Sequence, residues 1–536
     1  MAETTAFGQW QERLAVPIAD LAARLRALST WRRLVVAGVA GGVSALAQAP
    51  FDLWPLIFLT LPLFVWLIDA SGSARRPWLA AGQIGWAFGF GYFLIGLHWI
   101  AYAFLVDMKA HLWLLPFAAV LMPSGLAFFF ALPAGLARLV WPDDWRRIAL
   151  FAASLSLFEW LRGHILTGFP WNLFGYVWSG SETMIQSASL FGIYALSLIT
   201  IAAAAAPAAL VRTDGTRAGP YGPLAVGVAT VVVLFVFGLW RLPSGAMATV
   251  DGVALRIVQP NVPQAERWKS EFFTRNWRYL IDLTQSPGLE TRTHVIWPEA
   301  APPLLMLAEP EALQVVGDVL PDSTVLLTGV VRRENAEPRN RYFNSMAVID
   351  GKGRVLSTYD KAHLVPFGEY LPFEPLLESL GITKITGGEG GYSTGPGVKT
   401  LTLPSGPPVG PLICYEVIFP TAVVDPAARP QWFVNMTDDS WFGPWVGPYQ
   451  HLGIARVRAT EEGLPIARAA NTGVSAIIDP YGRIVASLDL NKRGVIDGGL
   501  PKALPQTLYA RFGDLLFFTF WLLTAIVGVI PRLFAR

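Results

Sequence analysis

Three short stretches of the chain carry side chains that could act together in nucleophilic catalysis. Cys414, the only cysteine, follows the apolar run Val409 to Ile413, so a buried strand would deliver it to the rim of a sheet. Glu299 follows the strand-like run His294 to Trp297, and Lys361 precedes a loop that contains proline and glycine. A lone cysteine is more often an inert buried residue than a nucleophile. A carboxylate and an ammonium that converged on it could supply the base and the cation that thiol catalysis needs.

The elements expected to hold these side chains lie between Val250 and Gln506. Short β-rich runs alternate there with helix-capable segments such as Glu309 to Val319 and His451 to Glu461, which predicts a layered α/β domain. Turn sequences at 350–353 and 479–482 each separate two strand-like runs and predict hairpins. The predicted strands are Ala254–Val258, His294–Trp297, Thr324–Val331, Ser345–Ile349, Val409–Cys414, Trp432–Met436, Ile466–Ala470 and Ser475–Ile478.

The composition places this domain in an integral membrane protein. Hydrophobic residues make up 53% of the 536 residues, charged residues make up 15%, and the mean hydropathy is +0.43. These values are too apolar for a soluble chain of this length. The formal net charge of +2 gives no argument for nucleic-acid binding. One cysteine excludes an intramolecular disulfide and leaves the redox compartment open.

Eight apolar stretches are candidates to cross a bilayer, for which a helix needs about 20 residues. The candidates are Leu34–Phe51, Trp54–Ala70, Trp78–Phe104, His111–Leu136, Ile148–Leu161, Met184–Val211, Pro223–Leu242 and Phe512–Ile530. Residues 1–30 lack a small-residue cleavage site, which predicts a retained interfacial or cytoplasmic helix. The expected organisation is therefore 1–249 with seven spans, a catalytic domain at 250–506, and the last span in 507–536.

Basic residues in the short loops predict the orientation. The loops after the second, fourth and sixth spans are rich in arginine, whereas the loop after the third offers only Lys109 and 163–182 has no Lys or Arg. Cytoplasmic loops carry the excess of basic residues, so the even-numbered loops face the cytoplasm. Seven spans then place the domain at 250–506 outside the cytoplasm. The arginines are Arg75, Arg76, Arg138, Arg146, Arg147, Arg212 and Arg217.

These motifs resemble known families. Trp-Pro-Glu at Glu299, the lysine at Lys361 and Ile-Cys-Tyr-Glu at Cys414 resemble the Glu-Lys-Cys triad of the nitrilase (carbon-nitrogen hydrolase) superfamily. Set among eight spans, the domain is similar to the apolipoprotein N-acyltransferase family of bacterial inner-membrane enzymes. The resemblance implies a polytopic helical domain plus an extracytoplasmic nitrilase-like αββα sandwich, on the periplasmic side of the inner membrane. Further matching motifs lie at 49–55, 168–171, 259–261, 439–443 and 468–471.

The resemblance also implies a reaction. Cys414 would attack a phospholipid acyl ester, typically of phosphatidylethanolamine, with Glu299 as general base and Lys361 stabilising the oxyanion. The thioester would then pass its acyl chain to the N-terminal amine of the diacylglyceryl-cysteine of an apolipoprotein. The supporting or substrate-binding residues that it implies are Glu369, Glu416, Tyr415, Trp268, Trp441, Phe442 and Asn471. No cofactor is implied, and the six histidines show no metal-ligand spacing.

Other interpretations stay open at this point. On sequence alone, Glu369 and Glu416 could be solvated or ion-paired carboxylates, and the aromatic residues could belong to the core. A membrane-tethered nitrilase-type amidase would keep the triad but would not need eight spans. A transporter or scaffold would explain the spans and not the triad, and no internal symmetry of the transporter kind is visible.

Two further expectations concern the membrane. Glu159 and Arg162 lie three residues apart at the end of the fifth expected span, and we interpret this pair as structural. Apolar loops at 367–377 and 441–448 contain glycine and proline, so they are candidates for a movable rim that admits lipid.

Overall fold

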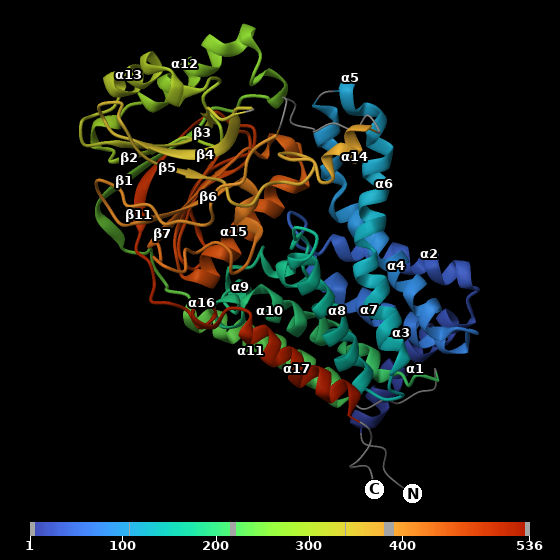
Figure 1. Ribbon diagram of the computed structural model, residues 1–536. Helices are drawn as coiled ribbons and strands as arrows, with labels where there is room; N and C mark the ends of the chain where they lie inside the picture. Colours follow the sequence, from blue (N-terminus) through green and yellow to red (C-terminus); the bar gives the residue numbers. More distant parts are fainter. Residues whose placement is uncertain (1–5, 107, 215–220, 338, 380–390, 531–536) are drawn as a thin grey trace, which may run out of the picture. The chain divides into compact units, whose positions relative to one another are not determined.

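The computed structural model describes residues 6–106, 108–214, 221–337, 339–379 and 391–530 (Figure 1). The chain forms two compact units. The first comprises Met1–His98, Pro116–Leu242 and Arg511–Arg536, and the second comprises Trp99–Leu115 and Pro243–Ala510. The first unit is helical, whereas the second contains both β-sheets.

Helices occupy every stretch for which a membrane span was predicted. They are α2 (Thr30–Ala45), α3 (Ile57–Ala70), α4 (Pro77–Gly96), α6 (Leu115–Leu126), α7 (Phe128–Leu139), α8 (Arg146–His164), α10 (Ala188–Ala205), α11 (Gly222–Arg241) and α17 (Leu515–Val529). The helix α1 (Ala6–Ala27) precedes them, and the short helices α5 (Met108–His111), α9 (Glu182–Ile185) and α16 (Leu508–Phe512) connect longer elements.

Five helical stretches among the described residues are long and apolar enough to cross a membrane. They are Trp54–Ser73, Pro77–Gly96, Ala118–Leu139, Ala188–Leu210 and Gly222–Arg241. The other three expected spans fall on α2, α8 and α17. Of these, α2 and α17 have 16 and 15 residues, and α8 carries charged residues at both ends, so these three spans stay predictions.

The third expected span ends earlier than predicted. The helix α4 ends at Gly96, and 98–105 forms a 3-10 helix instead of continuing to Phe104. The reason is that the chain enters the second unit at Trp99, whose indole Nε1 donates a hydrogen bond to Oε1 of Gln450 at 3.1 Å. An apolar sequence alone does not distinguish such a segment from the end of a span.

The charged pair at the end of α8 holds a loop in place, as its structural interpretation predicts. The guanidinium of Arg162 donates to the carbonyls of Phe169 and Trp171 at 2.7 and 2.6 Å. Oε1 of Glu159 accepts a hydrogen bond from the backbone N–H of Phe174 at 2.9 Å. Both side chains are buried, so each charge satisfies backbone groups of the loop at 169–174 that water cannot reach.

The second unit contains two mixed sheets. The six-stranded sheet has the order β11-β1-β2-β3-β4-β5 and the five-stranded sheet has the order β10-β9-β8-β7-β6. Strands β1 to β3 are parallel, as are β6 to β8, and the remaining pairs are antiparallel. The strands are β1 (Thr249–Gln259), β2 (His294–Ile296), β3 (Val325–Glu334), β4 (Arg341–Ile349), β5 (Val355–Asp360), β6 (Val409–Ile413), β7 (Trp432–Thr437), β8 (Ile466–Ala470), β9 (Ser475–Ile478), β10 (Ile484–Leu488) and β11 (Gly494–Pro501).

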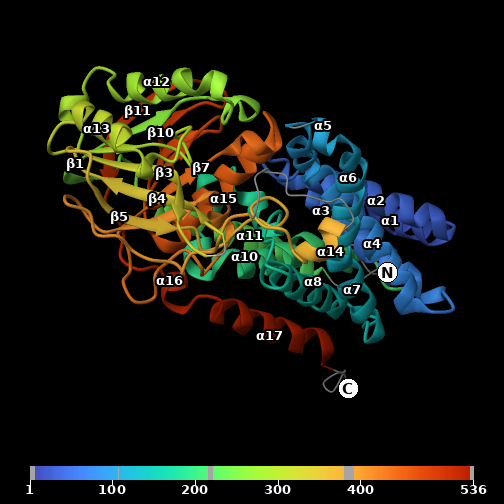
Figure 2. The same ribbon diagram turned by 45° about the horizontal axis from the view of Figure 1, so that its top comes forward.

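Two apolar clusters stabilise this unit. One draws buried side chains from both sheets, including Leu255, Met346, Val434 and Ile477. The other joins the opposite face of the six-stranded sheet to α12 (Phe273–Thr284) and α13 (Pro310–Val319), which lie beside that sheet in Figure 2. A third long helix of the unit, α15 (Val446–Glu462), is buried along most of its length.

The predicted strands are confirmed, and one further strand was not predicted. All eight predicted strands form, and β5 and β10 follow the two predicted hairpin turns. The strand β11 was missed because the sequence Gly494 to Pro501 is rich in glycine and lacks clear alternation. It forms because it pairs with β1 and buries Ile496 and Leu500 in the cluster between the sheets. Tertiary packing here overrides a weak local preference.

Strand ends deliver the candidate residues. Glu299 follows β2, Lys361 follows β5 and Cys414 follows β6. The turn that carries Glu299 packs directly on Gly329 of β3, where any side chain would meet backbone atoms. The absence of a side chain at Gly329 therefore sets how closely this turn can approach the sheet.

We expect Gly329→Ala to destabilise the protein. A methyl group there would lie 2.5 Å from Cα of Glu299 and 2.6 Å from N of Ala300, so backbone must move. Overpacking of this kind costs about 1–3 kcal/mol, which should lower the thermal unfolding midpoint of the detergent-solubilised protein. Gly245→Ala is the matched control because nothing lies within 4 Å of its added methyl. Equal midpoints for the two variants would contradict the proposed role of Gly329.

Candidate active site

Cys414 occupies a sharp turn at the end of β6. Its φ is +50°, a left-handed backbone conformation that residues with a side chain seldom adopt, and it begins the 3-10 helix Cys414–Ile418. The residue is 7% exposed. Such conformations persist only where the surroundings enforce them, and they concentrate at functional sites.

Glu416 enforces this turn and ties it to the end of β5. Its Oε2 accepts a hydrogen bond from the N–H of Ile413 at 2.8 Å. Its Oε1 accepts from the hydroxyl of Tyr359 at 2.7 Å and from the N–H of Ala362 at 2.8 Å. One buried carboxylate therefore fixes the segment before Cys414 against the segment that carries Lys361.

Glu299 is held by donors to both carboxylate oxygens. Oε1 accepts from Nδ2 of Asn344 at 2.7 Å, and Oε2 accepts from the backbone N–H of Asp438 at 2.8 Å. Arg267 donates to the backbone carbonyl of Glu299 and forms a buried ion pair with Asp438. Both the carboxylate and the backbone of Glu299 are thus fixed.

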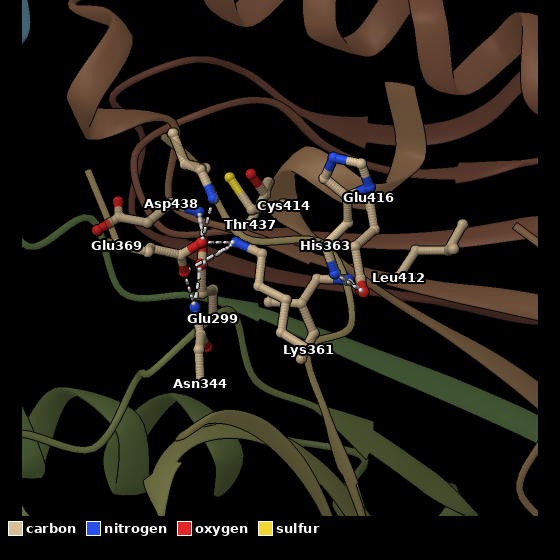
Figure 3. A network of polar contacts seen from close by, with 12 residues as sticks. Glu299, Asn344, Lys361, His363, Glu369, Leu412, Cys414, Glu416, Thr437 and Asp438 are labelled. Carbon is tan, nitrogen blue, oxygen red and sulfur yellow. Dashed lines mark hydrogen bonds and ion pairs between the residues drawn. The ribbon is translucent and has the colours of Figure 1, made fainter. Parts of the chain in front are cut away.

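Lys361 is a buried ammonium between two carboxylates. Its Nζ lies 2.9 Å from each carboxylate oxygen of Glu369 and 3.7 Å from Oε1 of Glu299. Asn344 bridges the same two glutamates, since its Nδ2 donates to Oε1 of Glu369 at 2.8 Å as well. Figure 3 shows Cys414 beside this group.

Burial and charge set the protonation states. Burial alone would lower the pKa of Lys361, but the negative charges of Glu369 and Glu299 outweigh it and raise this pKa, so the amine stays charged. Burial, followed by the negative charge of Glu299, raises the pKa of the Cys414 thiol well above its ordinary value. Burial also raises the pKa of Glu299, although Lys361 opposes the change. A neutral thiol beside a more basic carboxylate needs that carboxylate to remove its proton.

A second buried network lies behind Cys414. Nε2 of His451 lies 3.2 Å from the carbonyl oxygen of Cys414, and because a carbonyl can only accept, this nitrogen carries a hydrogen. Nδ1 of His451 lies 2.9 Å from Oδ1 of Asp439, and the guanidinium of Arg468 donates to Oδ2 of Asp439 at 2.6 Å. Burial would raise the pKa of Asp439, but Arg468 and His451 lower it to about 2. This ionised network orients the donor that holds the Cys414 backbone.

The predicted supporting residues separate into two groups. Glu369, Glu416 and Asn471 lie in or beside the polar network, and Asn471 joins Val262 to Asp438 through hydrogen bonds of 2.8 and 3.0 Å. Tyr415 is buried and packs edge-on against Phe419.

The aromatic candidates lie farther out. Trp268 is 48% exposed and lies beneath the guanidinium of Arg267. Phe442 is half-buried and packs against Trp99 and His451, with ring centroids 4.6 and 5.5 Å apart. Trp441 is also half-buried. Phe442 therefore supports the region of Cys414, whereas Trp445, Phe367 and Phe373 are exposed aromatic residues of the predicted rim.

Sequence reasoning missed four residues of this site. Asn344 lies on a strand and Arg267 lies in a loop. Nothing in the local sequence of either residue signals a buried contact. Asp438 precedes a motif that did attract attention, and His451 was considered only as a metal ligand. Among the described residues, no group of three or more His, Cys, Asp or Glu side chains is arranged to hold a metal ion.

Family models match both parts of the chain. Residues 40–206 match the model for the apolipoprotein N-acyltransferase N-terminal domain, and residues 263–507 match the carbon-nitrogen hydrolase model. An amidase from Nesterenkonia sp. is a solved structure with 17% identity and a TM-score of 0.35, over 52% of this chain and 99% of its own. A structural likeness this distant says nothing about activity. The family model defines the second unit as a carbon-nitrogen hydrolase domain in a polytopic membrane protein.

Curated relatives identify the family over most of the chain. Apolipoprotein N-acyltransferases from Rhodopseudomonas palustris and Bradyrhizobium diazoefficiens are 46% and 45% identical, each over 90% of this chain and 92% of their own. The enzyme from Brucella melitensis is 43% identical over 90% of this chain and 92% of its own. The chain belongs to the apolipoprotein N-acyltransferase family, which confirms the resemblance drawn from the motifs.

We expect alkylation of Cys414 by iodoacetamide to show a raised thiol pKa. Only the thiolate reacts, so the rate should still be rising with pH above about 10, where an ordinary thiol with a pKa of about 8.5 has nearly reached its plateau. The matched control is the exposed position 492 in the double variant Cys414→Ser/Lys492→Cys, whose rate should level off earlier. Coincident profiles, measured by intact mass, would contradict the assigned electrostatics.

Proposed function

We propose that the protein transfers an acyl chain from a phospholipid to the N-terminal amine of the diacylglyceryl-cysteine of apolipoproteins. The observation that carries this proposal is the convergence of Glu299, Lys361 and Cys414 in a chain of this family. We further propose phosphatidylethanolamine as the usual acyl donor. The roles below rest on the site geometry and on the family resemblance.

The first half-reaction acylates the cysteine. Glu299 takes the proton of the Cys414 thiol, and the thiolate attacks the ester carbonyl of the phospholipid. The resulting oxyanion is stabilised by the ammonium of Lys361, which needs no proton transfer because its pKa is raised. Collapse breaks the ester bond, and the leaving alkoxide takes the proton from Glu299. The products are a lysophospholipid and a thioester at Cys414.

The second half-reaction transfers the acyl chain to an amine. The neutral α-amine of the acceptor attacks the thioester carbonyl, and Lys361 again stabilises the oxyanion. Glu299 takes the proton that the new amide nitrogen must lose. Collapse expels the sulfur of Cys414, which receives that proton from Glu299. The site is thereby restored, and no net proton is gained or lost.

The finer architecture follows the same proposal. We infer eight membrane spans with the catalytic domain at 250–506 as an αββα sandwich, placed on the periplasmic side of the bacterial inner membrane. The distribution of arginines between alternate loops supports this orientation. Five helical stretches among the described residues are long and apolar enough to cross a membrane, which together with the family supports the multi-pass assignment.

We expect Glu299→Gln and Lys361→Ala each to abolish the acyl-enzyme. The first removes the proton acceptor and the second removes the charge opposite the oxyanion, and losses of such groups are about 10²- to 10⁴-fold each. The measurement is the intact mass of the protein after incubation with phosphatidylethanolamine, in which acylation of Cys414 adds one acyl chain. A near-normal thioester yield in either variant would show that the triad is misassigned.

The acceptor distinguishes the two activities that the triad supports. A transferase should hold the thioester until a diacylglyceryl-cysteine peptide is added and should then yield the N-acylated peptide. An amidase-type hydrolase would lose the thioester to water at the same rate with or without that peptide. Glu290→Gln, a change of the same kind at an exposed position outside the site, is the matched control for Glu299→Gln.

We expect a reporter thiol at Lys492 to be labelled from outside the inner membrane. The reporter is the double variant Cys414→Ser/Lys492→Cys, treated on intact spheroplasts with a membrane-impermeant maleimide. Seven spans before this residue would place it outside. Labelling that requires permeabilised membranes would overturn the proposed orientation, and with it the periplasmic acceptor.

A further inference from the structure

A basic pocket lies within the helical unit, where α2, α4 and the loop after α3 meet. Its volume is about 270 Å³, and three arginines line it, namely Arg33, Arg75 and Arg76. Leu34 and Leu79 contribute apolar wall. No aspartate or glutamate is among the described residues that line it.

The two helices run parallel, so their N-terminal ends lie side by side. A methyl group on Gly91 of α4 would lie 1.9 Å from the carbonyl oxygen of Gly38 of α2. A methyl group on Gly41 would lie 1.9 Å from the carbonyl oxygen of Phe88, and a methyl group on Gly42 would face the side chain of Ile95. Later residues of α2 therefore meet later residues of α4, and the glycines allow backbones to touch. This contact fixes the two N-terminal ends at one level.

Neither helix carries a group at its N-terminus that compensates the positive end of the helix dipole. The first turns of α2 and α4 contain no acidic residue, and neither N-cap residue, Ser29 or Arg76, makes a side-chain capping hydrogen bond. The unpaired N–H groups and the helix dipole both favour an anion at such an end. The two adjacent helix N-termini add to the positive electrostatic potential of the arginines. A helix N-terminus alone would not define a site.

The arginines are arranged to receive a phosphate. Nη1 of Arg33 donates to the carbonyl of Ala70 at 2.9 Å and Nη2 to that of Arg26 at 2.5 Å, so this guanidinium is fixed. Its Nε is a buried nitrogen with no hydrogen-bond partner among the described residues. None of the three pocket arginines forms an ion pair with a carboxylate within the part of the chain that the structure describes. Guanidinium groups match phosphate oxygens in geometry and charge.

Exposed aromatic and aliphatic side chains mark the level of the pocket in the membrane. Trp31 at the start of α2 is 63% exposed, and Trp78 at the start of α4 is 48% exposed. Tryptophan concentrates at the boundary between lipid headgroups and hydrocarbon. Val35, one turn after Trp31, and Leu79, the residue after Trp78, are also exposed. A phospholipid whose phosphate occupied the pocket would therefore place its acyl chains beside the apolar surfaces of α2 and α4.

We propose that this pocket binds the phosphate of an anionic membrane phospholipid. Basic pockets between membrane helices bind such headgroups in general. Because apolar surfaces of α2 and α4 flank the pocket, we propose a lipid phosphate in preference to free phosphate. The pocket contains none of Glu299, Lys361 and Cys414, so the proposal does not rest on the proposed function.

The test is native mass spectrometry of the full chain in detergent. Phosphatidylglycerol, phosphatidylcholine and inorganic phosphate are added separately. We expect retained phosphatidylglycerol and little of the other two. In Arg33→Gln/Arg75→Gln/Arg76→Gln the affinity for phosphatidylglycerol should fall by about fivefold per arginine, or about 100-fold in all. The control Arg24→Gln/Arg32→Gln/Arg212→Gln removes the same charge at exposed sites outside the pocket and should bind normally.

Each alternative result has a stated meaning. Because Arg33 also bonds two backbone carbonyls, Arg75→Gln/Arg76→Gln is tested in parallel, and it should weaken binding about 25-fold with an unchanged unfolding midpoint. Equal loss in pocket and control variants would mean general surface charge and would overturn the proposal. Retention of phosphatidylcholine or of inorganic phosphate as strongly as phosphatidylglycerol would also overturn it, because the anionic lipid would not be selected.

Discussion

The catalytic unit depends on one buried ammonium. Lys361 is 1% exposed, and an isolated charge at such a site would cost far more free energy than a domain can supply. It is tolerated because Glu369 and Glu299 lie on either side of it. Those carboxylates then require donors of their own, which Asn344, the N–H of Val365 and the N–H of Asp438 provide. The ends of several strands meet at this point. Residues from all of them are needed to supply the countercharges of Lys361 and the hydrogen-bond donors to its carboxylates.

A similar constraint governs the backbone around the nucleophile. Cys414 and Ala300 both have left-handed φ angles, of +50° and +40°, on the two segments that face each other across the site. Buried polar contacts hold each of them: His451 bonds the carbonyl of Cys414, Glu416 of the same segment bonds the N–H of Ile413, and Arg267 bonds the carbonyl of Ala300. These contacts therefore make the backbone of both segments rigid. A rigid Cys414 suits the proposed reaction, in which two large substrates approach the same sulfur in turn.

The sequence is informative where local chemistry and burial agree. The parallel strands β2 and β6 are short apolar runs, so their ends, and hence Glu299 and Cys414, were predictable from pattern alone. The strand β11 and the end of α4 at Gly96 were not, because both are decided by distant partners, β1 for the strand and Gln450 for Trp99. The same holds for Asn344, Arg267 and His451. Each acts through a contact with a residue more than 30 positions away, which no short motif encodes.

The arrangement of charge explains how a neutral buried thiol can react at all. With Glu299 and Glu369 ionised and Lys361 protonated, the resting site carries one net negative charge. In the proposed reaction, transfer of the thiol proton to Glu299 moves that charge to sulfur, and attack on the ester moves it on to the carbonyl oxygen. At each stage the charge stays near Lys361, and none has to be created or removed. A low-dielectric interior penalises new charge heavily but penalises displacement between prearranged partners much less. The burial that raises the thiol pKa is thus compatible with fast chemistry, because the same burial keeps the countercharge fixed in place.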